Sequence, residues 1–404
     1  MNQNTAVVVI GGGYAGVTAA DRLTRRDDVT VTLINPRPAF VERIRLHQLV
    51  GGSHDATVDY AQVLAERVRL VVDTVTGVDA AARTVALGAG GTLRYDYLVH
   101  AVGSHSADPG VPGAREHAFP LAGLEEARRL REALTPLPPG AAVTVVGAGA
   151  TGIETAAELA EQGGTVTLVC GGPLGPSLHR RGRRAVARHL AALGVTVLDG
   201  AGTRVTAVTR DGVDLADGRH LAGAVTVWTT GFAVPDLAAR SGLSTDALGR
   251  LLTDETLTSV DDVRVVAAGD AAAPSGLPFR MSCQAAGPLG ARAADTVLSR
   301  IAGEEPAPLA LLFVGQCLSL GRRAGVVQFA RRDDTPVGLH LAGRAGARVK
   351  EVVCRGTVRQ LALEARRPGR TSPPRWAGDP RRRMLLASGR GDARRTPATQ
   401  EGVR

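Results

Sequence analysis

Two glycine-rich segments of this 404-residue chain have the spacing with which a protein backbone binds phosphate groups. In each segment one glycine permits a tight turn, a second lets the backbone approach a pyrophosphate, and a third lets a helix pack on a strand. These glycines are Gly11, Gly13 and Gly16 in the first segment and Gly147, Gly149 and Gly152 in the second. The residues between them that we expect to contact the bound group are Tyr14, Ala15 and Thr151.

Each glycine segment lies between an apolar run and a helix-like stretch, which is the context that gives the motif its meaning. The first copy follows the apolar run 6–10 and precedes the stretch 17–26, and a second strand is predicted over 29–34. The start of such a helix offers free N–H groups and a positive dipole to phosphates. We therefore expect two nucleotide sites rather than glycines used only for turns. The matching elements around the second copy are strands over 143–146 and 165–169 and a helix over 153–162.

The residue that closes the second strand of each unit normally binds the adenosine ribose, and an acidic residue is usual there. Asn35 takes this position in the first unit and can still hydrogen-bond a ribose hydroxyl. Cys170 takes it in the second unit and is a poor acceptor, although it also fits a small buried apolar site. Because no carboxylate is there to repel a 2′-phosphate, NADH and NADPH stay equally open. Arg180 or Arg181 could reach that phosphate, or simply form a solvated face.

The composition is that of an ordinary globular protein, with 44% apolar and 22% charged residues. The net charge of +9 is concentrated in residues 366–404, where eleven arginines stand against three acidic residues. The rest of the chain is close to neutral and gives no support to nucleic-acid binding, which needs a basic face. No stretch approaches the roughly 20 uninterrupted apolar residues of a membrane-spanning helix, and residues 1–4 lack the basic character of a signal peptide. We therefore expect a cytoplasmic protein.

The four cysteines are widely separated along the chain, at Cys170, Cys283, Cys317 and Cys354. No CxxC pair exists, so the pattern argues against a zinc site and against a thioredoxin-like dithiol. The nine histidines show no metal-ligand spacing and no Ser-His-Asp pattern, and we expect no metal site. Any redox cofactor must therefore pass its electrons on without a dithiol from this chain.

A third segment, Val265 to Asp270, reads VVAAGD, and a buried strand predicted over 263–268 leads into its Gly269-Asp270. Together with the glycine segments, it makes residues 5–365 resemble the two-dinucleotide-domain flavoprotein reductases, which are pyridine nucleotide-disulfide oxidoreductase-like. The segments 149–154 and 319–323 look most like the type II NADH dehydrogenase and ferroptosis-suppressor-like group. The resemblance implies FAD at the first glycine segment and NAD(P)H at the second.

The resemblance also implies roles for single residues. Asp270, with Gly269 before it, would contact the ribityl chain of FAD. Glu154 would lie where the nicotinamide meets the flavin, although an acid also favours the start of a helix without any such role. Gln284 matches the first glutamine of a motif that lines the quinone side of the flavin, and we assign catalytic roles to Glu154 and Gln284. Pro288-Leu289 replaces the paired glutamines that follow in the family, and this departure weakens the case for a quinone.

Arg43 and Gly103 complete the residues that we expect at the FAD. Similar flavoproteins run the stretch 40–48 past the isoalloxazine ring, so Arg43 would contact it, or would belong to a helix with solvated arginines. Gly103 follows the strand predicted over 95–99. Cys283, next to Gln284, is expected to be a buried and inert thiol.

The expected fold is α/β, with two Rossmann-like FAD/NAD(P)-binding domains, the second inserted in the first, and a small C-terminal α+β domain. The FAD-binding domain is expected over 1–112 and 232–305, the NAD(P)H-binding domain over 113–231 and the C-terminal domain over 306–365. Residues 366–404 form a basic tail that is rich in Pro, Gly and Arg, and we expect it to be disordered. Its arginines could attract anionic lipid, but its prolines disfavour a continuous amphipathic helix.

The expected function is that of an FAD-dependent NAD(P)H dehydrogenase. Hydride passes to FAD, and electrons pass on to a small-molecule acceptor, a quinone or a quinone-like compound. Three alternatives stay open: a reductase for a ferredoxin or rubredoxin, a flavoenzyme that modifies a secondary metabolite, and a nucleotide-sensing flavoprotein without turnover. The sequence leaves the oligomeric state open.

Overall fold

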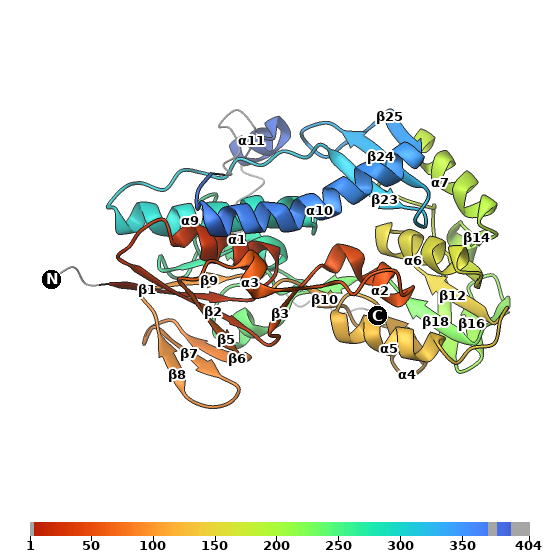
Figure 1. Ribbon diagram of the computed structural model, residues 1–404, viewed down its shortest axis with the longest axis horizontal. Helices are drawn as coiled ribbons and strands as arrows, with labels where there is room; N and C mark the ends of the chain where they lie inside the picture. The colour runs from red at the N-terminus through yellow and green to blue at the C-terminus, as the bar shows by residue number, and fades with distance from the viewer. Residues whose placement is uncertain (1–3, 371–377, 389–404) are drawn as a thin grey trace.

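Two parallel sheets lie at opposite ends of the molecule, and a third, antiparallel sheet with a long helix extends over both (Figure 1). The computed structural model describes residues 4–370 and 378–388. The N-terminal strands and the segment after residue 250 build the first end, and the middle of the chain builds the second.

The first parallel sheet is built around the first glycine segment. Its strands, in spatial order, are β21 (Val265–Ala267), β9 (Tyr97–His100), β1 (Thr5–Ile10), β2 (Val29–Asn35) and β5 (Val68–Val72). Helices α1 (Tyr14–Leu23) and α9 (Cys283–Ile301) pack against one another over one face, and a small sheet of β6 (Val75–Asp79), β7 (Thr84–Leu87) and β8 (Thr92–Arg94) covers the other. Side chains alternate along β1, so Val9 packs with the helices and Val8 with the small sheet. Burial on both faces explains the continuous apolar run at this strand.

The second parallel sheet repeats this arrangement around the second glycine segment. Its strands, in spatial order, are β11 (Ala118–Pro120), β18 (Val225–Trp228), β12 (Ala142–Val146), β13 (Thr165–Val169) and β14 (Thr196–Leu198). The elements around it are α5 (Leu124–Leu134), α6 (Ala150–Glu161), α7 (Arg180–Ala192) and a small sheet of β15 (Val205–Thr209), β16 (Gly212–Leu215) and β17 (His220–Ala222). In both sheets the strand before the glycine segment lies inside the sheet, so each segment emerges at the carboxyl edge where nucleotides bind.

Two segments cross between the sheets, and they pair with one another as β10 (His105–Ser106) and β19 (Phe232–Ala233). The other paired short strands are β3 (Ala39–Val41) with β4 (Thr57–Asp59), and β20 (Leu251–Thr253) with β22 (Ala272–Pro274). The short helices are η1 (Arg43–Arg45), α2 (Leu46–Val50), α3 (Tyr60–Val63), α4 (Ala114–His117), η2 (Ala201–Thr203), α8 (Leu237–Arg240) and η3 (Gly269–Ala271).

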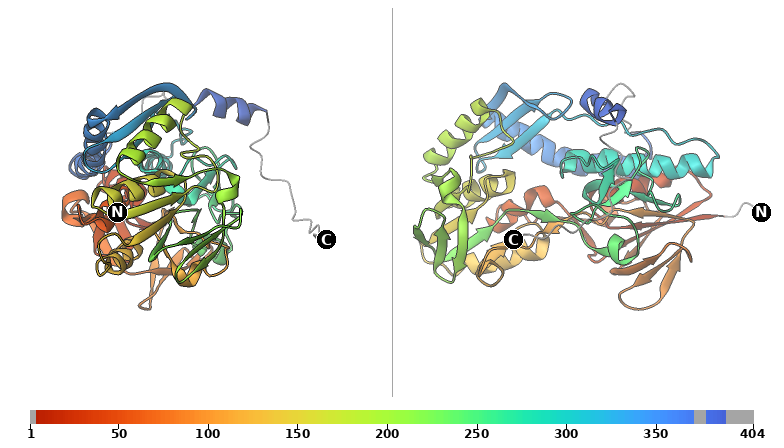
Figure 2. Two further views of the ribbon diagram at one scale, coloured as in Figure 1. Left: turned by 90° about the vertical axis from the view of Figure 1, so that its right-hand side faces the viewer. Right: turned by 180° about the vertical axis from the view of Figure 1, so that it is seen from behind.

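The C-terminal part joins the two ends of the molecule. Strands β23 (Gly315–Ser319), β24 (Gly325–Ala330) and β25 (Pro336–Gly343) form an antiparallel sheet beside α6 and α7. Helix α10 (Arg344–Arg366) then runs from this sheet back across α1 and α3 (Figure 2). Side chains of α10 therefore lie between the two glycine segments.

These observations confirm the predicted α/β fold with two Rossmann-type parallel sheets. The strand over 165–169 has its predicted bounds, whereas the helix predicted over 17–26 is observed over Tyr14–Leu23. It begins earlier because Gly13 is itself the N-cap, so the helix starts inside the glycine segment and includes Gly16. Among the described residues, no helix is long and apolar enough to cross a membrane.

The prediction that the chain is disordered after residue 365 is wrong for one segment. Pro380–Ala387 form helix α11. Pro380 stands in the first turn, where its missing N–H costs nothing, and the Asp379 side chain caps the helix by accepting from Arg381 N at 2.8 Å. A proline before an arginine run therefore starts a helix here instead of preventing one. The parts of this tail at 371–377 and 389–404 lie outside the described residues.

Candidate active site

The first glycine segment forms a cradle with open space beside it. Gly11 has a φ of +102°, and a Cβ there would lie 2.2 Å from the Ala101 carbonyl oxygen. A Cβ on Gly16 would lie 1.7 Å from the Gly11 oxygen, so helix and turn are in direct contact. A Cβ on Gly13 would meet nothing within 4 Å. Because no side chain caps α1, its first N–H groups are available, and the cradle fits the pyrophosphate of FAD.

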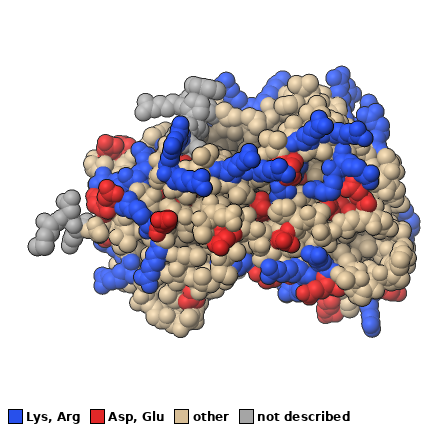
Figure 3. Space-filling model, in the orientation of Figure 1, with Lys and Arg blue, Asp and Glu red and all other residues tan. Residues whose placement is uncertain are grey.

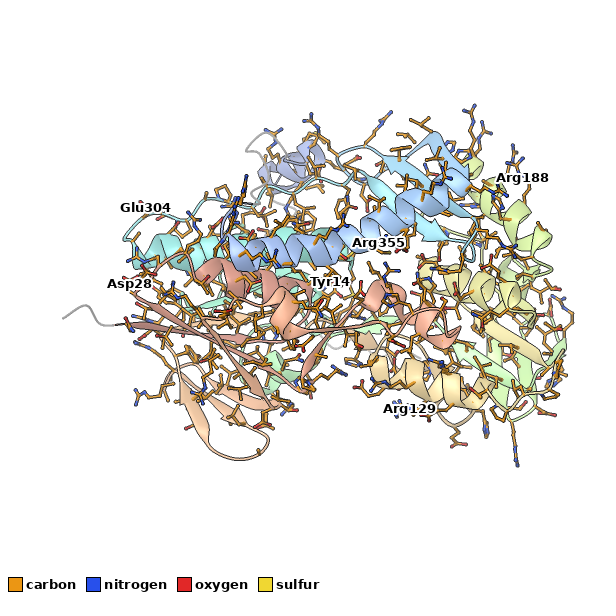
Figure 4. All side chains as sticks on the ribbon, viewed as in Figure 1. Tyr14, Asp28, Arg129, Arg188, Glu304 and Arg355 are labelled. Atoms are coloured by element: carbon orange, nitrogen blue, oxygen red, sulfur yellow. The ribbon has the colours of Figure 1, made fainter. Side chains whose placement is uncertain are left out.

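Asn35, Tyr14 and Ala15 surround this cradle. Asn35 Oδ1 accepts a hydrogen bond from Gly12 N at 3.0 Å, and its Nδ2 donates to the Arg37 carbonyl at 2.8 Å. The amide therefore fixes the glycine loop, and its contact with a ribose stays a prediction. Tyr14 lies near the middle of the molecule at the start of α1 (Figure 4), where burial raises the pKa of its phenol well above the ordinary value. Ala15 is buried beside it, and a Cβ on Gly269 would lie 2.9 Å from the Ala15 Cβ.

Asp270, Arg43 and Gly103, which are distant in the sequence, come together beside the first sheet. Arg43 Nη1 lies 3.6 Å from Asp270 Oδ2 and donates to Ser104 Oγ at 3.0 Å. Ser104 in turn donates to Asp270 Oδ2 at 2.7 Å. Gly103, with a φ of +71°, makes the turn that brings Ser104 there. The solvated-arginine interpretation of Arg43 does not hold, because its side chain is only 31% exposed and its guanidinium contacts Asp270 and the Ala122 carbonyl.

The second glycine segment repeats the geometry of the first. Gly147 has a φ of +131°, and a Cβ there would lie 2.3 Å from Thr229 Oγ1. A Cβ on Gly152 would lie 2.0 Å from the Gly147 oxygen, whereas one on Gly149 would meet nothing within 4 Å. No side chain caps α6, and Thr151 stands half-buried in its first turn. This second cradle fits the pyrophosphate of a pyridine nucleotide.

Cys170 stands in the position where an acidic ribose ligand is usual, and Asp199 lies close enough to influence its thiol. Cys170 follows β13, and burial raises the pKa of its thiol to about 12, so it is neutral. Arg180 and Arg181 begin α7 and are both exposed. The geometry therefore leaves NADH and NADPH open, as the sequence does.

A buried ion pair links the second dinucleotide fold to the C-terminal helix. Lys350 Nζ of α10 lies 2.8 Å from Glu154 Oε1 of α6 and donates to the Cys317 carbonyl at 3.2 Å. Glu154 also accepts from Ser319 N at 2.9 Å. Burial acts to raise the pKa of Glu154, but the Lys350 ammonium outweighs it and lowers that pKa below its usual value. Burial likewise acts to lower the pKa of Lys350, and the Glu154 carboxylate outweighs this effect and raises it. Both groups are therefore charged at neutral pH.

His47 of α2 adds a neutral group to this pair. Its Nδ1 lies 3.9 Å from Glu154 Oε2, and its Nε2 shares a 2.9 Å hydrogen bond with Ser319 Oγ. Complete burial lowers the pKa of His47 to about 4, despite the nearby carboxylate. Three parts of the chain thus meet at Glu154: α2 from the first end, α6 from the second, and β23 with α10 from the C-terminal part.

The Gln284 side chain hydrogen-bonds to the backbone just before and at the start of β23, and not to Glu154, Lys350 or His47. Its amide is satisfied by donating to the Gly315 carbonyl at 2.9 Å and accepting from Val314 N at 3.1 Å, which joins the start of α9 to β23. Pro288 stands inside α9, where the related motif continues with glutamines. Cys283, half-buried beside Gln284, has a thiol pKa that burial raises and the Lys350 charge partly lowers.

Sequence reasoning missed Lys350, Ser319 and Ser104. Lys350 is the only lysine of the chain, and it stands in a stretch whose other cations, Arg344, Arg348 and Arg355, are all arginines, which is a usable signal for a functional cation. Sequence reasoning also missed that Lys350 stands close to Cys283, Cys317 and Cys354, and the charge of Lys350 acts to lower the pKa of each of these thiols. Burial raises the pKa of all three thiols, so they are protonated. Within residues 4–370 and 378–388, no group of three or more His, Cys, Asp or Glu side chains could hold a metal ion.

The fold and this site define a class: an oxidoreductase with two dinucleotide-binding sheets, and a buried, charged centre where α2, α6, β23 and α10 meet. Residues 5–290 match the pyridine nucleotide-disulphide oxidoreductase family, and the chain belongs to it. Membership confirms the expectation of an oxidoreductase with FAD and NAD(P)H as cofactors.

Relatives and solved structures of similar length agree with this assignment. A NADH dehydrogenase-like protein of Mycobacterium tuberculosis is 33% identical over 352 residues, which are 80% of this chain and 87% of that protein. The type II NADH:quinone oxidoreductase of the same organism is 30% identical over 349 residues, 74% of each chain. The sulfide:quinone oxidoreductase of Aquifex aeolicus has the same fold, with a TM-score of 0.74, 20% identity and 95% coverage of both chains.

Proposed function

We propose that this protein is an NAD(P)H dehydrogenase that passes electrons through FAD to a quinone or a quinone-like small molecule. The observation that carries the proposal is the buried Glu154–Lys350 ion pair, because it places two opposite charges where the two dinucleotide folds and the C-terminal helix meet. The names of the relatives, NADH dehydrogenase-like protein and type II NADH:quinone oxidoreductase, support the same activity.

The two cradles would hold the cofactors. When bound, FAD would take up hydride from NAD(P)H and give two electrons to the acceptor. The backbone around Gly13 would bind the FAD pyrophosphate, and the backbone around Gly149 that of the nicotinamide nucleotide. Asp270, fixed by Ser104 and Arg43, would accept hydrogen bonds from ribityl hydroxyls. In this proposal residues 1–112 with 232–305 form the FAD-binding domain, and 113–231 form the NAD(P)H-binding domain.

Glu154 would orient the nicotinamide. Its Oε1 is occupied by Lys350 and Ser319 N, but its Oε2 has only His47, at 3.9 Å, among the contacts of the described residues. Oε2 can therefore accept from an amide N–H, such as that of the nicotinamide carboxamide. The neutral His47 adds no competing charge, and burial excludes water that would compete for this hydrogen bond.

Lys350 would act on the acceptor. An ammonium has three N–H donors, and two of them have acceptors among the described residues, at Glu154 and at the Cys317 carbonyl. The third is available to hydrogen-bond an acceptor oxygen that gains negative charge on reduction. A disulfide acceptor within the chain is disfavoured because all four thiols are protonated and no CxxC pair exists.

The direct test is steady-state oxidation of NADH and NADPH by the purified, flavin-loaded protein with a soluble short-chain benzoquinone. We expect oxidation of the nucleotide that depends on the quinone and saturates with it. A flavin-loaded protein that oxidises neither nucleotide with any quinone, or that needs an added ferredoxin-type carrier, would overturn the assignment.

A further inference from the structure

Arg382, in the tail of the chain, has a buried side chain although its helix lies at the surface. Its residue exposure is 8%, whereas Arg381 and Arg383 on either side are exposed. A buried guanidinium needs partners for its charge and for its five N–H donors. Helix α11 is therefore docked at Arg382.

The partners of Arg382 lie on two segments, one just after β20 and the other at the end of β22 and in the loop that follows it. Its Nε and Nη2 donate to both carboxylate oxygens of Glu255, at 2.9 and 2.7 Å. Its Nη2 and Nη1 also donate to the carbonyls of Pro274, at 2.8 Å, and Leu277. The guanidinium lies 4.4 Å from the centre of the Phe279 ring. Because a guanidinium is a rigid fork, this set of contacts fixes both the loop after β22 and the orientation of α11.

The same loop is held from its other side by the C-terminal sheet. Arg280 donates to both carboxylate oxygens of Asp334, at 2.6 and 3.1 Å, and lies 5.0 Å from the centre of the Phe313 ring. The Phe279 and Phe313 rings are 6.2 Å apart. Residues 275–282, which we call the acceptor loop, are thus clamped between α11 and the β24–β25 turn.

The acceptor loop connects two groups of the proposed active site. It follows Asp270 by a few residues and leads into α9, which Ser282 caps by accepting from Ala285 N at 3.3 Å. Cys283 and Gln284 come directly after it, and the Gln284 amide is bonded to Val314 and Gly315. A shift of the loop would therefore move Gln284 relative to Lys350.

We propose that Arg382 is a positioning residue for the electron acceptor, and that it acts through the acceptor loop on Gln284. The inference rests on the proposed function and on the expectation, given by the family resemblance, that Gln284 lines the acceptor side of the flavin. The nicotinamide side, with Glu154 and the second cradle, makes none of these contacts. Arg382 therefore acts on one half of the catalytic cycle and leaves the other half unchanged.

The test compares the two half-reactions in the full-length, flavin-loaded Arg382→Ala variant. We expect flavin bleaching by NADH to stay within about twofold of the parent rate, while reoxidation by a short-chain benzoquinone falls about tenfold, mainly through a raised KM for the quinone. Arg381→Ala and Arg383→Ala remove an exposed arginine from the same helix and should change neither rate. Arg382→Lys keeps the charge without the fork and should lie between parent and Arg382→Ala.

Equal loss in both half-reactions, or a lowered Tm with an unchanged quinone KM, would show that Arg382 is only structural and would overturn the inference. If Arg382→Ala does not fold, Glu255→Gln weakens the same contact with little change of size and should give the same split between the half-reactions. A parent protein whose flavin is bleached by neither NADH nor NADPH, or is not reoxidised by the quinone, contradicts the proposed function instead, so the two failures are distinguishable.

Discussion

Glu154 and Lys350 show how a single residue pair can serve both stability and chemistry. Each charge is buried, and each keeps its ionised state only because the other is present. Removing one partner leaves an uncompensated charge in a place without water, which is far more costly than removing both.

We predict that Lys350→Met lowers the free energy of unfolding by about 3–5 kcal/mol, and that the double variant Glu154→Gln/Lys350→Met recovers a large part of this loss. Urea unfolding of the flavin-loaded proteins measures both values. A single variant as stable as the parent would show that the pair is not desolvated.

In the same series Glu154→Gln should lower kcat/KM for NADH by roughly tenfold or more, because the carboxylate is the proposed nicotinamide ligand.

His47 makes stability depend on pH. Burial lowers its pKa to about 4, whereas an unfolded chain has the ordinary value near 6.5. The unfolded state therefore takes up a proton below about pH 6.5, and the folded state does so only near pH 4. The stability that this group contributes is full above about pH 6.5 and is lost as the pH falls through that window.

When the pH is lowered from 7 to 4.5, we predict that the free energy of unfolding falls by about 2–3 kcal/mol less in His47→Gln than in the parent. The reason is that glutamine keeps a hydrogen-bonding group but does not titrate. Denaturant unfolding at several pH values measures the difference. Parallel stability curves for variant and parent would contradict the assignment of a neutral His47. His100, whose pKa burial also lowers to about 4, stays in both proteins and contributes equally to each.

The glycine segments are the elements on which both cofactor sites depend, and their glycines have different tasks. Gly149 has a φ of −78°, which any residue adopts, and only open space beside it. Gly152 faces the Gly147 oxygen so closely that a Cβ would lie 2.0 Å away. In the proposed account a methyl group on Gly149 would meet the bound nucleotide, whereas one on Gly152 meets the protein.

We predict that Gly149→Ala folds with a stability within about 1 kcal/mol of the parent but binds NADH at least about tenfold more weakly. Gly152→Ala should instead lose several kcal/mol, on the order of an overpacked core substitution, because helix and turn must separate. Thermal unfolding and NADH titration of the flavin bleaching distinguish the two. Equal NADH affinity in Gly149→Ala and parent would mean that the pyrophosphate does not bind at this cradle.

The elements were more predictable than the contacts between them. Apolar runs and glycine spacing are local, so the strands, the two cradles and their helices follow from the sequence to within a few residues. The Glu154–Ser319 contact spans 165 residues, and the Lys350 partner lies even further along the chain, so no local pattern reveals it. Arg43, Gly103 and Asp270 lie together in the structure, and only the family resemblance suggested grouping them, while their contact with FAD stays a prediction. The prediction for the C-terminal tail was wrong at residues 380–387, because Pro380 was interpreted as a helix breaker although it starts a helix.

At the scale of the whole molecule, the charge distribution bears on the kind of acceptor. Basic and acidic side chains are interspersed on the face shown in Figure 3, and most of the net charge belongs to residues 366–404. A face that binds a small acidic carrier protein would instead concentrate one sign of charge.

We predict that kcat/KM for an uncharged benzoquinone changes less than about twofold between low and high salt, because screening does not act on a neutral substrate. Initial rates at about 0.02 and 0.5 M salt, with NADH saturating, measure this. Turnover that needs an acidic ferredoxin-type carrier and disappears at high salt would identify the protein as a carrier reductase.

The central claim is that electrons pass from NAD(P)H through FAD to a quinone, and anaerobic stopped-flow spectroscopy of the flavin tests it most directly. Mixing with NADH or NADPH should bleach the flavin absorbance within the time of one turnover, and a second mixing with a short-chain benzoquinone should restore it at a rate no slower than kcat. A flavin that neither nucleotide bleaches, or that stays bleached in the presence of the quinone, would contradict the account.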